Sequence, residues 1–340
     1  MSSHSDASGW PATVAALCGR RLLVIGDVML DEYLAGDARR VCPEAPVPVV
    51  ETTDRWSVPG GAANAAANAA ALGGRPVLGG VTGEDPAADA LVRVARTAGI
   101  DPAGLVTVSD RPTTSKLRIL ARGQQVIRVD TESVAAVPAS PSEQLTAWAE
   151  RSVAEADAVL LSDYGKGLFA GVLARRVIEA ARRVGRPVVV DPKGPDPGRY
   201  RGATVLKPNP SELADLSGRP VRTLAEMMTA GRWLAEELAG TAILVTRGSE
   251  GMAIFQAGRP PQGLAAGPAR RVYDVTGAGD TVAAALALAL AARLPLETAA
   301  RIANMAAGVA VGKVGTAVVT PDELLAALAG GVTEFVPLTG

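Results

Sequence analysis

The sequence predicts an α/β protein in which helices cover both faces of a central, mostly parallel sheet. Apolar segments of strand length alternate with segments of helix length from about residue 77 to residue 311, as in chains built of βαβ units. Apolar residues make up 48% of the chain and aromatic residues 3%, a composition that suits close packing and excludes disorder. Residues 21–26 are almost wholly apolar, which is typical of a strand buried on both faces.

The remaining elements follow in order along one domain, expected over residues 20–330. A tail at residues 1–19 precedes this domain, with a short helix near 11–18, and a second tail is expected at 331–340. Strands are expected at 21–26, 77–81, 105–108, 158–161, 187–190, 204–207, 242–245 and 252–255. Helices are expected at 86–98, 141–154, 168–184, 223–238, 281–292 and 296–311.

Two further regions, residues 33–57 and 112–131, carry short alternating segments instead of helices. The first contains a proline-rich stretch and the second reads as a hairpin. Because proline removes donors from a strand ladder, these segments belong at a sheet edge or in a small separate sheet. We expect them to form a β-lid over the substrate, with Lys116, Arg118 or Arg128 facing an anionic group. A solvated hairpin face is an equal alternative.

Composition excludes several classes of function. The net charge of −1 argues against a nucleic-acid partner, and the apolar run at 281–292 is too short to span a membrane. Two cysteines and the lack of a leader sequence favour the cytoplasm. His4 is the only histidine, so Ser-His or Cys-His catalysis and His-based metal sites are excluded.

The most informative stretch is Val-Tyr-Asp-Val-Thr-Gly-Ala-Gly-Asp at residues 272–280, before an Ala-rich helix. Gly277, Ala278 and Gly279 would let amides at the helix start close on an anion. A carboxylate there repels a phosphate unless it takes a proton, so Asp280 is the candidate base for phosphoryl transfer. A favourable helix dipole and a plain tight turn are the alternatives. The glycine spacing fits neither a dinucleotide fingerprint nor a Walker loop.

Polar residues follow several expected strands, at the sheet edge where open α/β folds bind ligands. Carboxylates there suit sugar hydroxyls, and a glycine pair before a helix lets the backbone approach a ligand. The residues expected to bind substrate are Asp27, Asp31, Gly60, Gly61, Asn64, Lys116, Arg118, Asp163, Lys166 and Lys193. A solvated turn is an equal alternative for Asp31.

Asn209 and Glu212 are three residues apart at an expected helix start. An amide oxygen and a carboxylate on one side of a helix suit Mg²⁺ that keeps part of its water shell. Taken alone, the same spacing is a capping box.

Two stretches resemble the signatures of the PfkB (ribokinase-like) carbohydrate kinases: Pro59-Gly-Gly-Ala-Ala-Asn64 and Asp274-Val-Thr-Gly-Ala-Gly-Asp-Thr281. The resemblance covers about residues 20–330 and implies an ATP-dependent kinase with Asp280 as base and residues 277–279 as anion hole. It implies that Asn209 and Glu212 organise Mg²⁺, and that Asp274 and Thr276 supply a site for a monovalent cation such as K⁺. The nucleotide site that it implies comprises Asn209, Thr246, Arg247, Gly248, Gly251 and Asn304.

Within the family, the stretches at 26–31, 42–50, 162–167, 191–194 and 199–203 resemble the D-glycero-β-D-manno-heptose-7-phosphate kinases. Such enzymes phosphorylate the C1 hydroxyl to give the 1,7-bisphosphate, on the route to ADP-heptose. A second, nucleotidylyltransferase domain of the bifunctional members is not expected here, so another protein would perform that step.

Two alternatives stay open: a kinase of ribose, fructose or fructose phosphate, and a non-catalytic sugar-phosphate sensor. The expected partners are ATP and a sugar phosphate, with neither nucleic acid nor membrane. Exposed edges of the lid predict a homodimer formed lid to lid.

Overall fold

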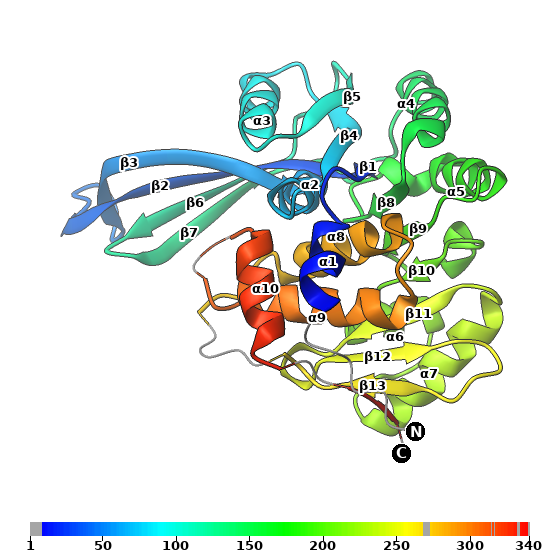
Figure 1. Cartoon of the computed structure of the whole chain (residues 1–340). Coiled ribbons are helices and arrows are strands. Elements are labelled where there is room, and N and C mark those ends of the chain that lie inside the picture. The colour runs from blue at the N-terminus through cyan, green and yellow to red at the C-terminus, as the bar shows by residue number, and fades with distance from the viewer. Residues whose placement is uncertain (1–8, 268–272, 314, 316, 332–333, 339–340) are drawn as a thin grey trace.

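In the described part of the chain, ten strands form one large sheet (Figure 1). This computed structural model describes residues 9–267, 273–313, 315, 317–331 and 334–338, so His4 and Val272 lie outside the described residues. The strands, in their order across the sheet, are β14 (Phe335–Pro337), β13 (Gln262–Leu264), β12 (Met252–Phe255), β11 (Ala242–Thr246), β10 (Val205–Leu206), β9 (Val188–Asp191), β8 (Ala158–Ser162), β1 (Arg21–Gly26), β4 (Arg75–Thr82) and β5 (Asp101–Thr107). Neighbours from β11 to β5 run parallel, and β12, β13 and β14 are antiparallel.

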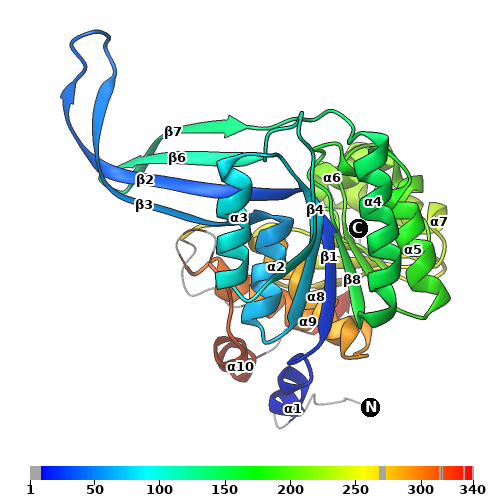
Figure 2. The same cartoon turned by 90° about the horizontal axis from the view of Figure 1, so that it is seen from above.

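Side chains of β1 alternate between two hydrophobic cores, one on each face of the large sheet. Leu22 and Val24 belong to one core, and Leu23 and Ile25 to the other. The first face is covered by α1 (Trp10–Ala15), α2 (Ala62–Ala71), α3 (Pro86–Thr97), α8 (Ala278–Ala291), α9 (Leu296–Ala310) and α10 (Pro321–Ala329). The opposite face is covered by α4 (Ala139–Ser152), α5 (Leu173–Arg183), α6 (Pro210–Ser217) and α7 (Leu224–Glu237). Figure 2 shows these two helical layers on either side of β1 and β8.

A second sheet of four strands projects from the side of the large one (Figure 2). Its strands, in spatial order, are β3 (Pro48–Gly61), β2 (Val28–Val41), β6 (Ser115–Ala121) and β7 (Gln124–Thr131). The segments expected to form a lid lie in this sheet. Because β2 begins at Val28, directly after β1, the single residue Asp27 stands at the junction of the two sheets.

The expected helix at 168–184 was wrong at its start. A short 3-10 helix, Leu168–Ala170, is separated from α5 by Gly171, whose φ of −101° and ψ of −142° are not helical. Part of the segment assigned to a C-terminal tail pairs with β13 as β14. Near the other end, α1 buries Trp10 and Val14.

Among the described residues, no helix combines the length and the hydropathy that crossing a membrane requires.

Candidate active site

The start of α8 is a tight turn in which Gly277 has a φ of 78°. That left-handed conformation is open to glycine because it has no Cβ. The N–H of Ala278 donates to the carbonyl of Val275 at 3.2 Å, so one of the three expected anion-hole amides takes part in the turn itself. A Cβ added to Gly279 would lie 3.6 Å from the Nζ of Lys207. The turn therefore places the amino end of a helix beside a buried ammonium group, an arrangement that favours an anion.

Asp280 lies in the first turn of α8 and is only 6% exposed. Its Oδ2 accepts a hydrogen bond from Asn64 Nδ2 at 2.6 Å, and its Oδ1 accepts one from Tyr164 Oη at 2.5 Å. Burial raises the pKa of Asp280, and the bonds from Tyr164 and Asn64 oppose that shift. A raised pKa makes a carboxylate a better proton acceptor near neutral pH, and each oxygen keeps a lone pair for a substrate hydroxyl.

A further layer of hydrogen bonds fixes Asn64. The fully buried Asn68 donates from Nδ2 to the carbonyl of Asn64 at 3.0 Å and accepts from Thr281 Oγ1 at 2.8 Å. The two asparagines lie on α2 and Thr281 lies on α8, so the network joins the two helices that carry the site. Leaving such a buried group unpaired costs about 1–3 kcal/mol, which holds Asp280 and its neighbours in one arrangement.

Lys207, directly after β10, forms a buried ion pair that was not expected from the sequence. Its Nζ is 2.9 Å from Oδ1 of Asp191 and its side chain is 3% exposed. Burial lowers the pKa of Lys207, but the charge and hydrogen bond of Asp191, together with the charges of Glu212 and Asp280, outweigh burial and raise the pKa. Burial also raises the pKa of Asp191 to about 7, although Lys207 opposes the shift. Lys207 carries the same signal as Asp27, a polar residue at the end of a buried strand, and could have been found by it.

Asp27 ties three segments together at the junction of the sheets. Its Oδ2 accepts from the backbone N–H groups of Tyr164 and Lys166 at 2.8 and 3.1 Å, and its carbonyl accepts from the N–H of Ala62 at 3.0 Å. Burial raises the pKa of Asp27 to about 6 against the effect of the two N–H groups. Asp27 therefore positions the loop after β8 and the start of α2. Tyr164, on that loop, was not proposed from the sequence either.

Asp31 and Arg118 form an ion pair within the lid, with Nη1 of the arginine 2.9 Å from Oδ1 of the aspartate. The guanidinium carbon of Arg118 also lies 5.2 Å from the centre of the Tyr33 ring. A Cβ on Gly60 would come within 2.9 Å of the Asp31 carboxyl carbon, so glycine allows this approach. Arg118, expected to face an anionic group of the substrate, thus has a carboxylate partner inside the protein.

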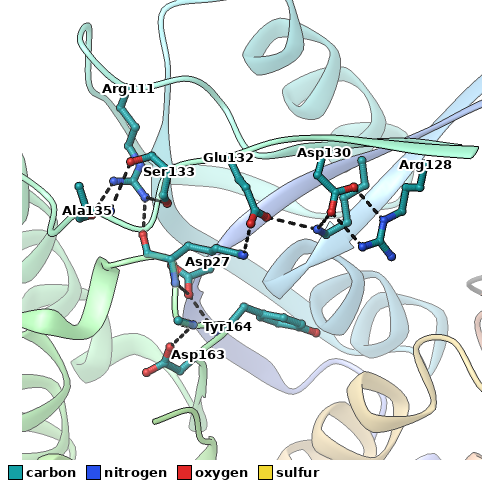
Figure 3. Close-up of polar contacts among 12 residues, drawn as sticks. Asp27, Arg111, Arg128, Asp130, Glu132, Ser133, Ala135, Asp163 and Tyr164 are labelled. Atoms are coloured by element: carbon teal, nitrogen blue, oxygen red, sulfur yellow. Dashed lines mark hydrogen bonds and ion pairs between the residues drawn. The ribbon is translucent and has the colours of Figure 1, made fainter.

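Lys116 and Lys166 converge on Glu132, which follows β7. Nζ of Lys166 is 2.7 Å from Oε1 of Glu132, and Nζ of Lys116 is 3.3 Å from Oε2. Lys116 is also 3.1 Å from Oδ2 of Asp130. Figure 3 shows Glu132 above Asp27 and between the lid strand and the loop that carries Tyr164. The structure brings together two of the expected basic residues, and Glu132 was missed.

Asp163, also expected to bind substrate, contacts Tyr200 and Arg199. Its Oδ2 accepts from Tyr200 Oη at 2.5 Å and lies 3.5 Å from Nη1 of Arg199, while its Oδ1 accepts from the N–H of Gly165 at 2.7 Å. Burial raises the pKa of Asp163, and these donors oppose the shift. The contacts of Asp163 therefore hold the loop after β8.

Asn209 and Glu212 form the capping box of α6. Asn209 Oδ1 accepts from the N–H of Glu212 at 2.9 Å, and Glu212 Oε2 accepts from the N–H of Asn209 at 2.9 Å. Glu212 Oε1 lies 3.3 Å from Nζ of Lys193, and the charge of Glu212 contributes to the raised pKa of Asp191. The neighbouring carboxylates of Asp191 and Glu212 are hard oxygen donors of the kind that Mg²⁺ prefers. The described residues contain no group of three or more His, Cys, Asp or Glu side chains placed for a metal.

The residues expected to bind nucleotide lie on three segments. The N–H of Thr246, at the end of β11, donates to the carbonyl of Pro208 at 3.0 Å, and that of Arg247 donates to the carbonyl of Gly251 at 2.7 Å. Gly248 opens the short turn between Arg247 and Gly251. These contacts place the end of β11 beside the start of α6.

A cavity of about 600 Å³ is lined mainly by residues of α9 and α10. Gly267, Met305 and Gly308 line it. Asn304 adjoins this wall and donates from Nδ2 to the carbonyl of Ala265 at 2.8 Å. The cavity has the size and the apolar lining of a small-molecule site.

Asp274 and Thr276 meet in the loop before α8. Oδ1 of Asp274 accepts from the N–H of Thr276 at 2.8 Å, and Oδ2 accepts from the N–H of Gly315 at 3.2 Å. Burial raises the pKa of Asp274, but these hydrogen bonds outweigh it and hold the pKa below its usual value. The carboxylate is therefore charged and joins two loops.

A model of the pfkB family carbohydrate kinases matches residues 20–323 of the chain. The chain belongs to this family. The expected class of enzyme, an ATP-dependent carbohydrate kinase, is confirmed by this membership.

Two bifunctional proteins named HldE are similar in sequence. HldE of Shewanella amazonensis is 47% identical over 316 residues, which are 93% of this chain and 65% of that protein. HldE of Halorhodospira halophila is 47% identical over 314 residues, which are 92% of this chain and 64% of that protein. The chain thus spans less than two thirds of the length of these relatives.

Solved structures confirm the expected ribokinase-like fold. Ribokinase of Arabidopsis thaliana, complexed with ribose and ATP, matches with a TM-score of 0.69 and 25% identity, over 91% of this chain and 99% of that one. Phosphofructokinase-2 of Escherichia coli, in complex with substrates and products, matches with a TM-score of 0.70 and 21% identity, over 92% and 99%.

Proposed function

We propose that this kinase transfers the γ-phosphate of ATP to the C1 hydroxyl of D-glycero-β-D-manno-heptose 7-phosphate and so forms the 1,7-bisphosphate. The observation that carries the proposal is the buried Asp280 at the start of α8, bonded to Asn64 and Tyr164. The choice of a heptose phosphate is supported by the 47% identity to the HldE proteins and by the sequence stretches that resemble heptose-phosphate kinases.

In this mechanism Asp280 accepts the proton of the C1 hydroxyl as the oxygen attacks the γ-phosphorus. A C1–O–P bond forms, the bond to the bridging oxygen of ADP breaks, and the proton stays on Asp280 until the product leaves. Asn64 orients the carboxylate, and Asp27 and Asp31 accept hydrogen bonds from other hydroxyls of the sugar. The amides of residues 277–279 and the ammonium of Lys207 stabilise the charge that develops on the transferred group. The second sheet, as a lid, excludes water.

ATP would lie between the start of α6, the turn at Arg247–Gly251 and the cavity beside Asn304. Glu212, with Asn209 and the nearby Asp191, would hold Mg²⁺ through water. The ion neutralises the phosphate charge when bound. Asp274 and Thr276 would hold a monovalent cation, a proposal supported by the similarity of the fold to Escherichia coli phosphofructokinase-2, which has been solved in complex with potassium.

The protein would act in the cytoplasm as a homodimer formed through the lid. The lid edges β3 and β7 each have one open side in the described sheet, and exposed apolar side chains lie on them, among them Trp56, Ile127 and Val129. Such edges favour pairing with a second copy. Light scattering that gives a monomer mass would contradict the dimer.

A panel of sugar phosphates with ATP, read as ADP release, tests the substrate. We expect the highest kcat/KM with the heptose 7-phosphate. A higher value with ribose, fructose or fructose 6-phosphate would assign the chain to one of those sugars, and no sugar-dependent ADP release would favour a sensor. Asp280→Asn is expected to lower kcat about 10²–10⁴-fold; activity within a few-fold of the parent would remove Asp280 from the role of base.

A further inference from the structure

Lys116 and Lys166 both pair with the carboxylate of Glu132, and Lys116 pairs with Asp130 as well. The two ammonium groups come from different segments, one from β6 and one from the loop after β8, and both contact Glu132. The exposed fractions of the Lys116, Lys166 and Glu132 side chains are 19%, 17% and 29%. Two cations that converge on one partly buried carboxylate present the geometry that binds a phosphate group.

This cluster adjoins the proposed sugar site. Lys116 stands in register with Asp31 on the neighbouring strand β2, and the charge of Asp31 contributes to the raised pKa of Asp280. On the other side, the N–H of Lys166 donates to Asp27 at 3.1 Å. Lys116 and Lys166 therefore lie beside Asp31 and Asp27, the two carboxylates that we propose to bind the sugar.

The other two expected basic residues are engaged differently. Arg118 is paired with Asp31 and packs over Tyr33, and Lys193 is paired with Glu212 at the start of α6. Asp31 belongs to the proposed sugar site, and Glu212 belongs to the proposed nucleotide and Mg²⁺ site. Glu132 has no role in the proposed reaction, so it is the carboxylate that can be displaced.

The backbone around the cluster is held by Arg111, whose side chain is mostly buried. Its guanidinium donates to the carbonyls of Ser133 at 2.7 Å, of Ala135 at 2.9 Å, and of Lys166 (Figure 3). The segment after Glu132 and the loop of Lys166 are thereby fixed to each other. Exchange of one anion for another needs only the side chains to move.

We propose that Lys116 and Lys166 bind the phosphate of the sugar substrate and that Glu132 occupies their site until that phosphate displaces it. This inference rests on the proposed function, because it requires a phosphorylated sugar. A phosphate carries about −1.5 to −2 charges at neutral pH, more than the single charge of Glu132, so it competes for the two ammonium groups. A neutral hydroxymethyl end cannot displace the carboxylate. Glu132 thus sets a preference for phosphorylated over free sugars.

Calorimetric titration without ATP tests the proposal apart from catalysis. The ligands are heptose 7-phosphate, fructose 6-phosphate and ribose 5-phosphate, each beside its unphosphorylated sugar. Lys116→Met and Lys166→Met should each weaken binding of the preferred sugar phosphate about 10- to 100-fold and change binding of the free sugar by less than about twofold. Lys166→Arg should retain most of the affinity.

Glu132→Gln should tighten binding of the sugar phosphate about 5- to 10-fold, because the amide does not compete for the two cations. Arg40→Met removes a lid cation whose side chain is 64% exposed and serves as the matched control, with no change expected.

The proposal is overturned if Glu132→Gln binds the sugar phosphate no tighter than the parent does. Lysine variants that weaken phosphorylated and free sugars equally would overturn it too, as would a parent chain without preference for any phosphorylated sugar. Absence of ADP release would instead contradict the proposed function, while the binding ratios would still test Glu132.

Discussion

Replacing Lys207 by methionine should destabilise the protein by an amount that grows with pH. The substitution removes the cation 2.9 Å from the buried Asp191, and an unpaired buried charge costs about 3–5 kcal/mol. Asp191 escapes part of that cost by taking a proton. In the parent its pKa is about 7, and without Lys207, which lowers it, the pKa rises further.

The direction of this pH dependence is set by the number of protons that Asp191 binds in the folded and unfolded states. Below pH 7 both folded proteins hold a protonated Asp191, so the difference in the free energy of unfolding between them stays constant. Above pH 7 the parent loses the proton, whereas the variant keeps it to a higher pH, so the stability of the variant relative to the parent falls by at most about 1.4 kcal/mol per pH unit. Between pH 7 and pH 8.5 the added loss can therefore reach about 2 kcal/mol.

Urea unfolding of both proteins at pH 6, 7 and 8.5 measures this difference. Lys207→Met combined with Asp191→Asn should abolish the pH dependence yet leave kcat low, because the cation beside the start of α8 is still missing. Arg201→Met, which breaks an exposed pair with Glu237, should cost less than about 1 kcal/mol at every pH. A loss in Lys207→Met that is the same at pH 7 and 8.5 would refute the reasoning.

Three further predictions concern the same region. Tyr164→Phe removes a bond that opposes the raised pKa of Asp280, so the acid limb of the pH profile of kcat should move to higher pH; an unmoved limb would contradict this. Burial raises the pKa of Asp27 from 3.8 to about 6, so the folded protein favours the protonated form of this side chain. Its contribution to the free energy of unfolding is therefore present in full below pH 4 and falls by about 3 kcal/mol as the pH rises to 6. Asp27→Asn should remove that slope in urea unfolding, and an equal slope in both proteins would refute it. Asn68→Ala should lower the free energy of unfolding by about 1–3 kcal/mol in the same assay, and a loss below about 0.5 kcal/mol would show that the network is not needed.

Most elements of the large sheet could be predicted because a strand buried on both faces is apolar at every position. β1 and β8 show this pattern, with burial along nearly their whole length. β13 and β14 have three residues each, too few to show a period, and they pair with each other across more than 70 residues of chain. α10 was missed although Thr320, Pro321 and Glu323 form a capped helix start, a signal that the sequence does contain.

The residues of the candidate site also fall into those that a continuous motif marks and those that only the fold brings together. Asp280 and the glycine turn before it could be predicted because the motif is continuous in the chain. Tyr164 and Glu132 could not, because their roles depend on contacts between segments far apart: Tyr164 is 116 residues from Asp280. Lys116 and Lys166 were expected to contact the substrate, and only the fold gives them Glu132 as an internal partner.

The separation of the residues that meet at Asp280 has a consequence for biosynthesis. Asn64 emerges from the ribosome 216 residues before the acid that it contacts, and α8, which carries that acid, also fills the middle of one hydrophobic core. Until α8 docks, the growing polypeptide has an open apolar face and lacks the carboxylate that we propose as the base. Under the proposed mechanism, phosphoryl transfer would therefore start only after this late segment has reached Asn64.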